Sequence, residues 1–101
     1  MKKMVILGAG ESGVGSAILA KGKGFDVFVS DKGEVKQKYR DMLEQHGIRW
    51  EEGKHTESEI FSAEEVIKSP GVREDAPVVV RLREKGIPVI SSVSFPSNAG
   101  L

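Results

Sequence analysis

Residues 4–13 read MVILGAGESG, and this stretch decides the fold of the chain. Its four leading apolar residues are typical of a strand that is buried on both faces. The glycines have G-x-G-x-x-G spacing, in which Gly8 permits a tight turn, Gly10 lets the backbone approach ligand oxygens, and Gly13 lets the next helix pack closely on the strand. The start of that helix would direct free N–H groups and its positive dipole end toward an anion. The stretch therefore predicts a turn that binds a diphosphate.

The composition predicts one domain with no electrostatic preference for nucleic acid or membranes. The chain has 101 residues, which is enough for a single core but short for a complete enzyme. Charged residues make up 30% of it, yet the formal net charge is zero, so neither nucleic acid nor an anionic membrane is an expected partner. No apolar run approaches the roughly 20 residues of a membrane span, and the early glycine turn interrupts any signal-peptide pattern. The absence of cysteine fits the cytoplasm, where we expect the protein to reside.

Strand and helix patterns alternate along the chain. The spacing of Thr56 and Glu59 resembles a capping box at the start of a short helical turn, and residues 51–54 read as a loop. Alternation over short connections predicts an α/β, Rossmann-like three-layer domain with a mainly parallel five-stranded sheet. Strands are expected at 3–7, 26–30, 48–50, 65–68 and 89–90, helices at 13–23, 35–46 and 76–86, and a helical turn at 57–61.

Three candidate features fall at the carboxyl edge of this sheet, where ligands of such folds bind. The first is the glycine turn. The second is Asp31, which lies 18 residues after Gly13 at the end of the second strand. An acid there bonds ribose hydroxyls in dinucleotide folds, although it could instead cap the second helix. The third is the Ser-Pro-Gly sequence at 69–71, which is either a backbone ledge against a ligand or an ordinary turn.

Two residues inside the glycine stretch have side chains that could meet the anion. The hydroxyl of Ser12 could donate to a phosphate oxygen, or it could cap the helix. Glu11 carries a negative charge, so only its backbone N–H is a sensible contact for a diphosphate.

The remaining polar and aromatic residues have structural interpretations. His46 is expected at a helix end and His55 at the surface, while Tyr39 and Trp50 are expected to cover the sheet. The acidic pairs at 51–52 and 64–65 read as solvated loop residues. No nucleophile, base and acid stand together, and no side chains have metal-ligand spacing. We therefore expect neither catalytic residues nor a metal site on this chain.

The motifs together resemble the N-terminal domain of the D-glutamate-adding Mur ligases. The residues that carry the resemblance are VILGAGESGVG at 5–15, VSD at 29–31, IKSPG at 67–71 and GIPVI at 86–90. The Ser-Pro-Gly element is the most discriminating of them, because nicotinamide-binding domains do not specially require it. The resemblance covers residues 3–91, most of the chain.

The resemblance implies that residues 1–91 hold the UDP end of UDP-N-acetylmuramoyl-L-alanine in an ATP-dependent D-glutamate ligase of peptidoglycan synthesis. Glu11 and Ser12 would meet the diphosphate, Asp31 and Lys32 would lie on the uridine side, and Ser69 and Gly71 would line the nucleotide pocket. The implied substrate-binding residues, with the glycines of the turn, are Gly8, Gly10, Glu11, Ser12, Gly13, Asp31, Lys32, Ser69 and Gly71.

The same resemblance places the remaining chemistry on other parts of the ligase. In that family a central domain brings the ATP P-loop and a C-terminal domain receives the amino acid, and the enzyme uses ATP and magnesium. No GxxxxGK[ST] sequence occurs here, so this chain alone is expected to be inactive and to hold no cofactor. The family tends to place acidic residues after the last strand, where this chain has SSVSF at 91–95. Residues 92–101 are therefore expected to be a divergent or recombinant tail.

Two other functions remain compatible with the residues. The glycine turn and Asp31 also suit an NAD(P)-binding domain of a dehydrogenase or a redox sensor. A non-catalytic Rossmann-like module that has lost ligand binding would keep the same pattern.

Overall fold

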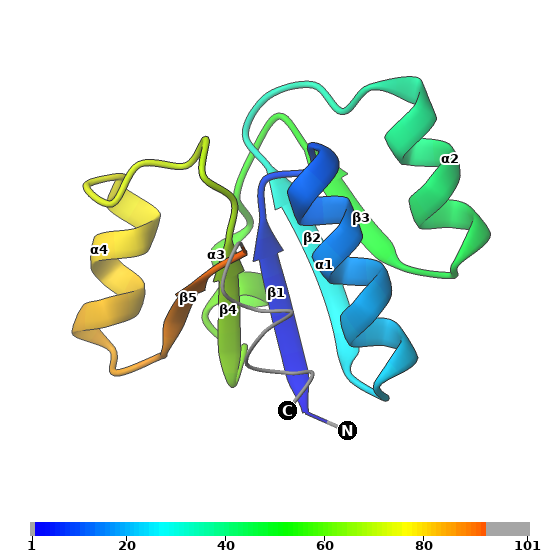
Figure 1. The fold of residues 1–101 in the computed structure, drawn as a ribbon. Helices are drawn as coiled ribbons and strands as arrows, with labels where there is room; N and C mark the ends of the chain where they lie inside the picture. The colour runs from blue at the N-terminus through cyan, green and yellow to red at the C-terminus, as the bar shows by residue number, and fades with distance from the viewer. Residues whose placement is uncertain (1, 93–101) are drawn as a thin grey trace.

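The central feature of the fold is a five-stranded sheet with the strand order β3-β2-β1-β4-β5, in which every neighbouring pair is parallel (Figure 1). The computed structural model describes residues 2–92. The elements in chain order are β1 (Lys3–Leu7), α1 (Glu11–Gly22), β2 (Asp26–Asp31), α2 (Gln37–Gln45), β3 (Arg49–Glu52), α3 (Glu57–Ile60), β4 (Glu65–Lys68), α4 (Pro77–Glu84) and β5 (Val89–Ser91).

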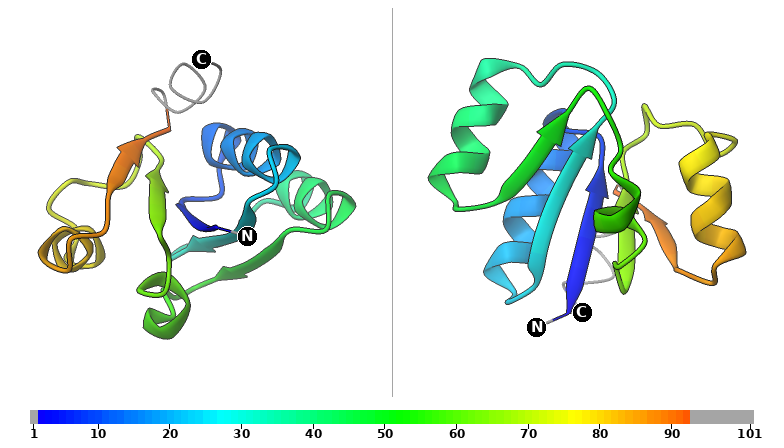
Figure 2. Two further views of the ribbon diagram at one scale, coloured as in Figure 1. Left: turned by 90° about the horizontal axis from the view of Figure 1, so that it is seen from below. Right: turned by 180° about the vertical axis from the view of Figure 1, so that it is seen from behind.

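Helices cover both faces of this sheet. Seen from below, α1 and α2 lie on one side, and α3 and α4 lie on the other (Figure 2). Side chains alternate along β1 accordingly: Met4 and Ile6 pack in the cluster under α1 and α2, whereas Val5 and Leu7 pack in the cluster under α3 and α4. All four are fully buried. The predicted Rossmann-like three-layer fold is confirmed.

Several predicted boundaries need correction. The first helix begins at Glu11, not at Gly13, because Gly10 is already its extended N-cap, with φ −89° and ψ −164°. The third strand continues to Glu52, so the loop predicted at 51–54 is wrong over its first two residues. The other strand and helix predictions agree with the structure to within three residues at either end.

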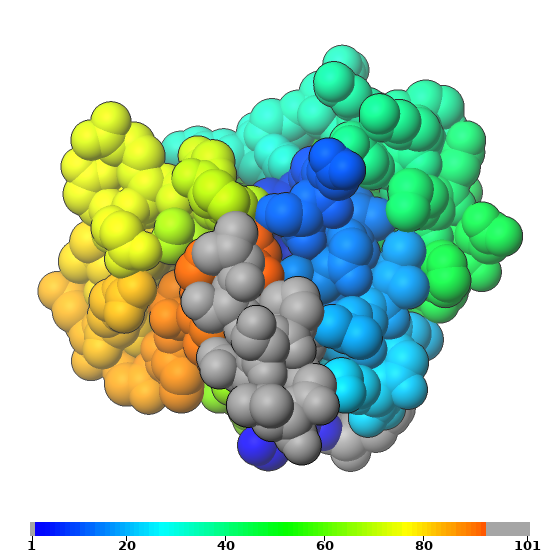
Figure 3. Space-filling view, viewed as in Figure 1, coloured from blue at the N-terminus to red at the C-terminus, as the bar shows by residue number. Residues whose placement is uncertain are grey.

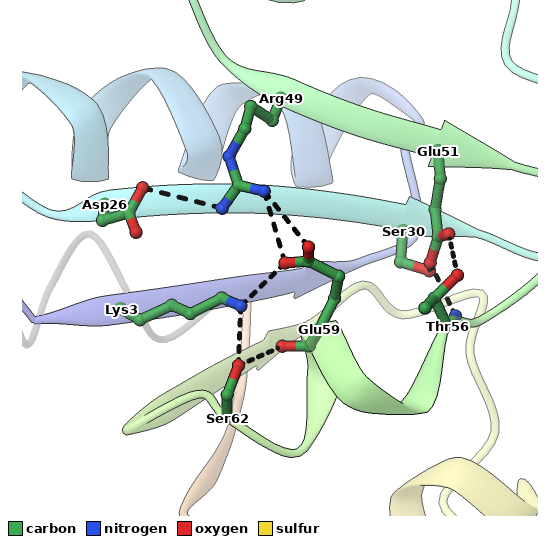
Figure 4. A network of polar contacts seen from close by, with 8 residues as sticks. All are labelled: Lys3, Asp26, Ser30, Arg49, Glu51, Thr56, Glu59 and Ser62. Carbon is green, nitrogen blue, oxygen red and sulfur yellow. Dashed lines mark hydrogen bonds and ion pairs between the residues drawn. The ribbon is translucent and has the colours of Figure 1, made fainter.

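An ion-pair network fastens α3 to the amino-terminal ends of three strands (Figure 4). Lys3 of β1 donates to Glu59 of α3 over 2.8 Å and to the Ser62 hydroxyl over 2.7 Å. Arg49 of β3 pairs with Glu59 at 3.3 Å and with Asp26 of β2 at 3.8 Å. The network lies at the sheet edge opposite the glycine turn, so it supports the fold and not the candidate site.

Ser92 is the first residue of the predicted tail and the last residue that the structure describes. Its N–H donates to the Lys68 carbonyl over 2.8 Å, and the residue is buried. Residues 93–101 lie outside the described range, so the domain boundary stays a prediction. Among the helices at 2–92, none has the length and apolar character needed to span a bilayer.

Candidate functional site

The glycine turn brings the start of α1 against the end of β1. Gly8 has a φ of +98°, a conformation that favours glycine, and its N–H donates to the Ser30 carbonyl over 2.9 Å. A Cβ on Gly13 would stand 1.8 Å from the Gly8 carbonyl oxygen. A Cβ on Gly10 would meet nothing within 4 Å. Gly13 is therefore required for packing, whereas Gly10 faces open space.

Asp31 joins this turn to the end of β2. Its Oδ2 accepts the Ala9 N–H over 2.7 Å, and its Oδ1 accepts the Gly33 N–H over 2.8 Å. The alternative in which this carboxylate caps the second helix is wrong, because Lys36 precedes α2 and the helix has no side-chain cap. Each carboxylate oxygen can accept a second hydrogen bond, so Asp31 keeps capacity for a ligand hydroxyl.

The Ser-Pro-Gly loop forms the facing side. The Val72 N–H donates to the Ser69 carbonyl over 3.0 Å, so residues 69–72 make a β-turn. The Ser69 hydroxyl donates to the Gly8 carbonyl over 3.3 Å and ties the loop to the glycine turn. The largely buried Lys68 side chain donates to the Val72 carbonyl over 2.8 Å and pairs with Glu74. The loop therefore has turn geometry, which both interpretations allow, and its role as a ledge against a ligand stays a prediction.

Seven of the nine predicted binding residues line one cleft of about 330 Å³ at this edge. In the space-filling view, the blue start of α1 and the yellow-green loop after β4 lie on either side of it (Figure 3). The other two are placed differently: Gly13 packs behind the turn, and Lys32 lines an adjoining hollow of about 310 Å³. The cleft lining comprises Gly8, Gly10, Glu11, Ser12, Asp31, Ser69, Pro70, Gly71 and Val72.

The side chains of Ser12 and Thr56 do not cap their helices. Gly10 is the N-cap of α1 and that helix has no side-chain cap, so the capping alternative for Ser12 is wrong. The Ser12 hydroxyl lies 2.9 Å from the Ser92 hydroxyl instead. Thr56 is the N-cap residue of α3, as predicted, but the side-chain bond of the capping box is wrong, because the Thr56 hydroxyl donates to Glu51 over 2.5 Å.

Glu51 is a structural acceptor, which corrects its assignment to a solvated loop. Its carboxylate receives the Ser30 hydroxyl over 2.7 Å and the Thr56 N–H over 2.8 Å (Figure 4). Burial alone would raise the pKa of Glu51, but the hydrogen bonds from Thr56 and Ser30 outweigh it and leave the pKa below the ordinary 4.5. Glu52, its neighbour, accepts both from Arg40 and from the Val35 N–H. Neither residue of this pair is free in solvent.

His55 is half-buried beside the cleft, which corrects the expectation of a surface position. Its Nδ1 lies 2.7 Å from the Ser30 hydroxyl oxygen. Burial lowers the pKa of the His55 ring, and Lys32 lowers it further, against the opposing effect of Glu51 and Asp31. A sequence signal existed, because the loop after β3 also emerges at the carboxyl edge of the sheet. His46, by contrast, is the C-cap of α2, as predicted.

Replacing Glu51 by glutamine is expected to reduce the acid sensitivity of the fold. Because the folded-state pKa of Glu51 lies below 4.5, its carboxylate stabilises the fold above about pH 4.5, and that contribution is lost as pH falls through the folded pKa. The variant should lose about 1–2 kcal/mol at pH 7 and show a flatter decline below pH 4.5. Urea unfolding at pH 3 to 7 measures both. The exposed Glu44→Gln is the control, and an unchanged acid profile for Glu51→Gln would contradict the assignment.

The described residues contain no group of three histidine, aspartate or glutamate side chains that could hold a metal ion.

Tyr39 and Trp50 pack against the core under α1 and α2, as predicted.

Comparisons with known proteins agree with this geometry. The model of the MurD N-terminal domain matches residues 3–78. The chain is 61% identical over 95 residues to a UDP-N-acetylmuramoylalanine–D-glutamate ligase of Bacteroides fragilis. The aligned residues make up 94% of this chain and 21% of that protein. The corresponding ligase of Christiangramia forsetii is 58% identical over 96 residues, which cover 95% of this chain and 22% of that protein. The chain thus spans about a fifth of the length of these relatives.

Solved structures share the fold. The UDP-N-acetylmuramate-alanine ligase MurC of Thermotoga maritima superposes with a TM-score of 0.79 at 26% identity, covering 98% of this chain and 23% of that one. A murein peptide ligase of Psychrobacter arcticus superposes with a TM-score of 0.84 at 24% identity, covering 97% of this chain and 20% of that one, which shows the fold alone. The family model matches well over half of the chain, and the chain therefore belongs to the MurD N-terminal domain family of the Mur ligases.

Proposed function

We propose that this domain binds the UDP end of UDP-N-acetylmuramoyl-L-alanine within an ATP-dependent D-glutamate ligase of peptidoglycan synthesis. The observation that carries the proposal is the cleft at the carboxyl edge of the sheet, in which seven predicted residues converge. The relatives that match at 58–61% identity are ligases named for this substrate and for D-glutamate.

Each side of the cleft suits one part of a nucleoside diphosphate. The first-turn N–H groups of α1 have no intrahelical partners and offer donors to the diphosphate, with the Ser12 hydroxyl beside them. Gly10 leaves room for phosphate oxygens to approach the backbone. Asp31 and Lys32 continue the edge toward the ribose and base, and Ser69 and Gly71 line the opposite side.

The remaining steps of the reaction belong to other parts of the proposed ligase. This sequence has no GxxxxGK[ST] motif, so ATP and Mg²⁺ would bind to a central domain and the D-glutamate to a C-terminal one. We propose that these two domains are its partners, that the chain alone is inactive and holds no cofactor, and that the ligase works in the cytoplasm.

Titration with UDP-N-acetylmuramoyl-L-alanine, followed by amide chemical shifts, tests the proposal. The expected result is a perturbation concentrated at residues 8–13, 31–32 and 69–71, because these segments form the cleft and its continuation. NADH is the comparison ligand, since a nicotinamide-binding domain would use the same turn. Tighter binding of NADH than of UDP would overturn the proposal, as would no perturbation at millimolar substrate.

A further inference from the structure

A buried hydroxyl fixes the proton positions next to the cleft. Ser30 is 0% exposed, and its Oγ lies 2.7 Å from Glu51 Oε2, 2.7 Å from His55 Nδ1 and 3.1 Å from the Lys54 carbonyl oxygen. The carboxylate and the carbonyl can only accept, so the imidazole is the one neighbour that can donate to Ser30. A hydroxyl has one proton to donate. The hydrogen bonds that lower the pKa of Glu51 keep its carboxylate ionised, so this carboxylate has no proton to give. If Ser30 donated to His55, two lone pairs would face each other between Ser30 and Glu51.

The proton arrangement that avoids this repulsion has consequences for the imidazole. Ser30 donates to Glu51, and His55 Nδ1–H donates to Ser30. Because burial lowers the pKa of His55, the ring is neutral near pH 7 and carries this one proton. Its Nε2 therefore holds an unshared pair. Within residues 2–92, Nε2 has no hydrogen-bond partner. Every buried side-chain nitrogen or oxygen in that range does have a partner, so Nε2 is not buried and a ligand can reach it.

His55 lines two hollows that continue from the diphosphate cleft. The nearer one, of about 310 Å³, shares Gly8, Asp31 and Gly71 with the cleft and also includes Lys32. The farther one, of about 220 Å³, is lined by Lys32 and by residues 76–78 at the start of α4, which read Ala-Pro-Val. A base attached to a diphosphate at the glycine turn would extend into these hollows. There the start of α4 offers an apolar surface, His55 a hydrogen-bond acceptor and Lys32 a cationic donor.

We propose that His55 is a base-selecting residue, whose Nε2 accepts a hydrogen bond from the ring N–H of an oxopyrimidine such as uracil. Uracil presents an N–H between two carbonyl oxygens, which matches an acceptor in a hollow that the cationic Lys32 also lines. Cytosine presents an unprotonated ring nitrogen at the same position, and its lone pair would face that of His55. The inference rests on the proposed function, because the diphosphate must occupy the cleft for the base to reach this hollow.

The charged groups around the ring set the pH range of this selectivity. Lys32 disfavours protonation of His55, whereas Glu51 and Asp31 favour it. Glu57 and Arg81 line the farther hollow and pair with each other. Protonation would convert Nε2 into a donor, so the preference for uracil should be lost at pH values well below 6.5.

Ring NMR of this chain tests the proton arrangement without a ligand. Long-range ¹H–¹⁵N correlation at pH 7.5 is expected to show His55 in the tautomer protonated at Nδ1. The tautomer protonated at Nε2 would overturn the proposal.

Affinities for UDP and CDP, measured by chemical-shift titration, test the selectivity. UDP should bind the unaltered chain about three- to tenfold more tightly than CDP at pH 7.5, which is the effect of one hydrogen bond. The preference should disappear or reverse once the pH is low enough to protonate His55, because the Nε2–H would then oppose the uracil N–H and donate to the cytosine nitrogen. UDP and CDP carry the same diphosphate, so titration of the phosphates changes both affinities equally and cancels in their ratio. His55→Phe should equalise the two ligands, and His55→Gln, which offers an amide oxygen, should restore part of the difference. His46→Phe, at an exposed histidine on the far end of α2, is the matched control.

The outcomes separate this inference from the proposed function. If UDP perturbs residues 8–13 but UDP and CDP bind the unaltered chain equally, the role of His55 is wrong and the diphosphate site stands. If UDP perturbs none of these residues, both are wrong. A uracil preference that survives in a folded His55→Phe variant would also overturn the role of His55.

Discussion

Gly13→Ala is expected to lower the free energy of unfolding by about 3 kcal/mol or more. The added Cβ would stand 1.8 Å from the Gly8 carbonyl oxygen and 2.8 Å from the Ser69 hydroxyl. Relief requires α1 to move away from the turn, which would open the buried contacts of Val14 and Ala17 with the sheet. Small domains have only about 5–15 kcal/mol of total stability. Urea unfolding followed by circular dichroism measures the loss.

Gly15→Ala is the matched control for this change, since it makes the same substitution two residues further along the helix. A Cβ there meets nothing within 4 Å, and alanine is a better helix former than glycine. The control should therefore gain about 0.5–1 kcal/mol. Equal stability of the Gly13→Ala variant and the unaltered chain would show that the close approach of helix and turn is not required.

Gly10→Ala is expected to weaken UDP binding by about tenfold or more while leaving the fold intact. The backbone of Gly10 is extended with a negative φ, which alanine adopts without strain, and a Cβ has free space in the unliganded protein. That space is where a diphosphate oxygen would approach the backbone, so a methyl group should exclude it. Chemical-shift titration with UDP gives the affinity, and the amide spectrum reports the fold.

The opposite effects of two glycines of one motif make this comparison specific. Gly13→Ala should lose stability, whereas Gly10→Ala should lose affinity alone. Gly15→Ala, which lies outside the cleft lining, should retain normal affinity. A folded Gly10→Ala variant that binds UDP as well as the unaltered chain would refute the assignment of the turn to the diphosphate.

The sheet was predictable because its strands are short apolar runs with clear ends. β1 ends before Gly8 and β4 ends before the Ser-Pro-Gly turn, and both have the predicted bounds. β3 was predicted too short because Glu51 and Glu52 look like loop residues in isolation. A strand accommodates these two carboxylates because residues from other segments, such as Ser30 and Arg40, donate hydrogen bonds to them. Periodicity along the chain contains no information about such partners.

The composition of the cleft was predictable from topology, because the carboxyl ends of parallel strands meet at one edge. Ser69 and Asp31 could be placed beside the glycine turn for that reason alone. His55 follows β3 at the same edge, but a lone histidine in a polar loop gives no indication of its burial or of its contact with Ser30. The contact of Ser12 with Ser92 was equally hidden, since it joins residues 80 positions apart.

The two hydrogen bonds of Asp31 determine when the cleft acquires its shape. One carboxylate holds the backbone after β1 and the backbone after β2 together before any ligand is present. The conformational entropy of both turns is therefore lost during folding, and arrival of a diphosphate orders little further backbone. Association should then resemble docking to a rigid surface. Its rate would be limited by diffusional encounter and by removal of phosphate hydration, and not by rearrangement of the rim.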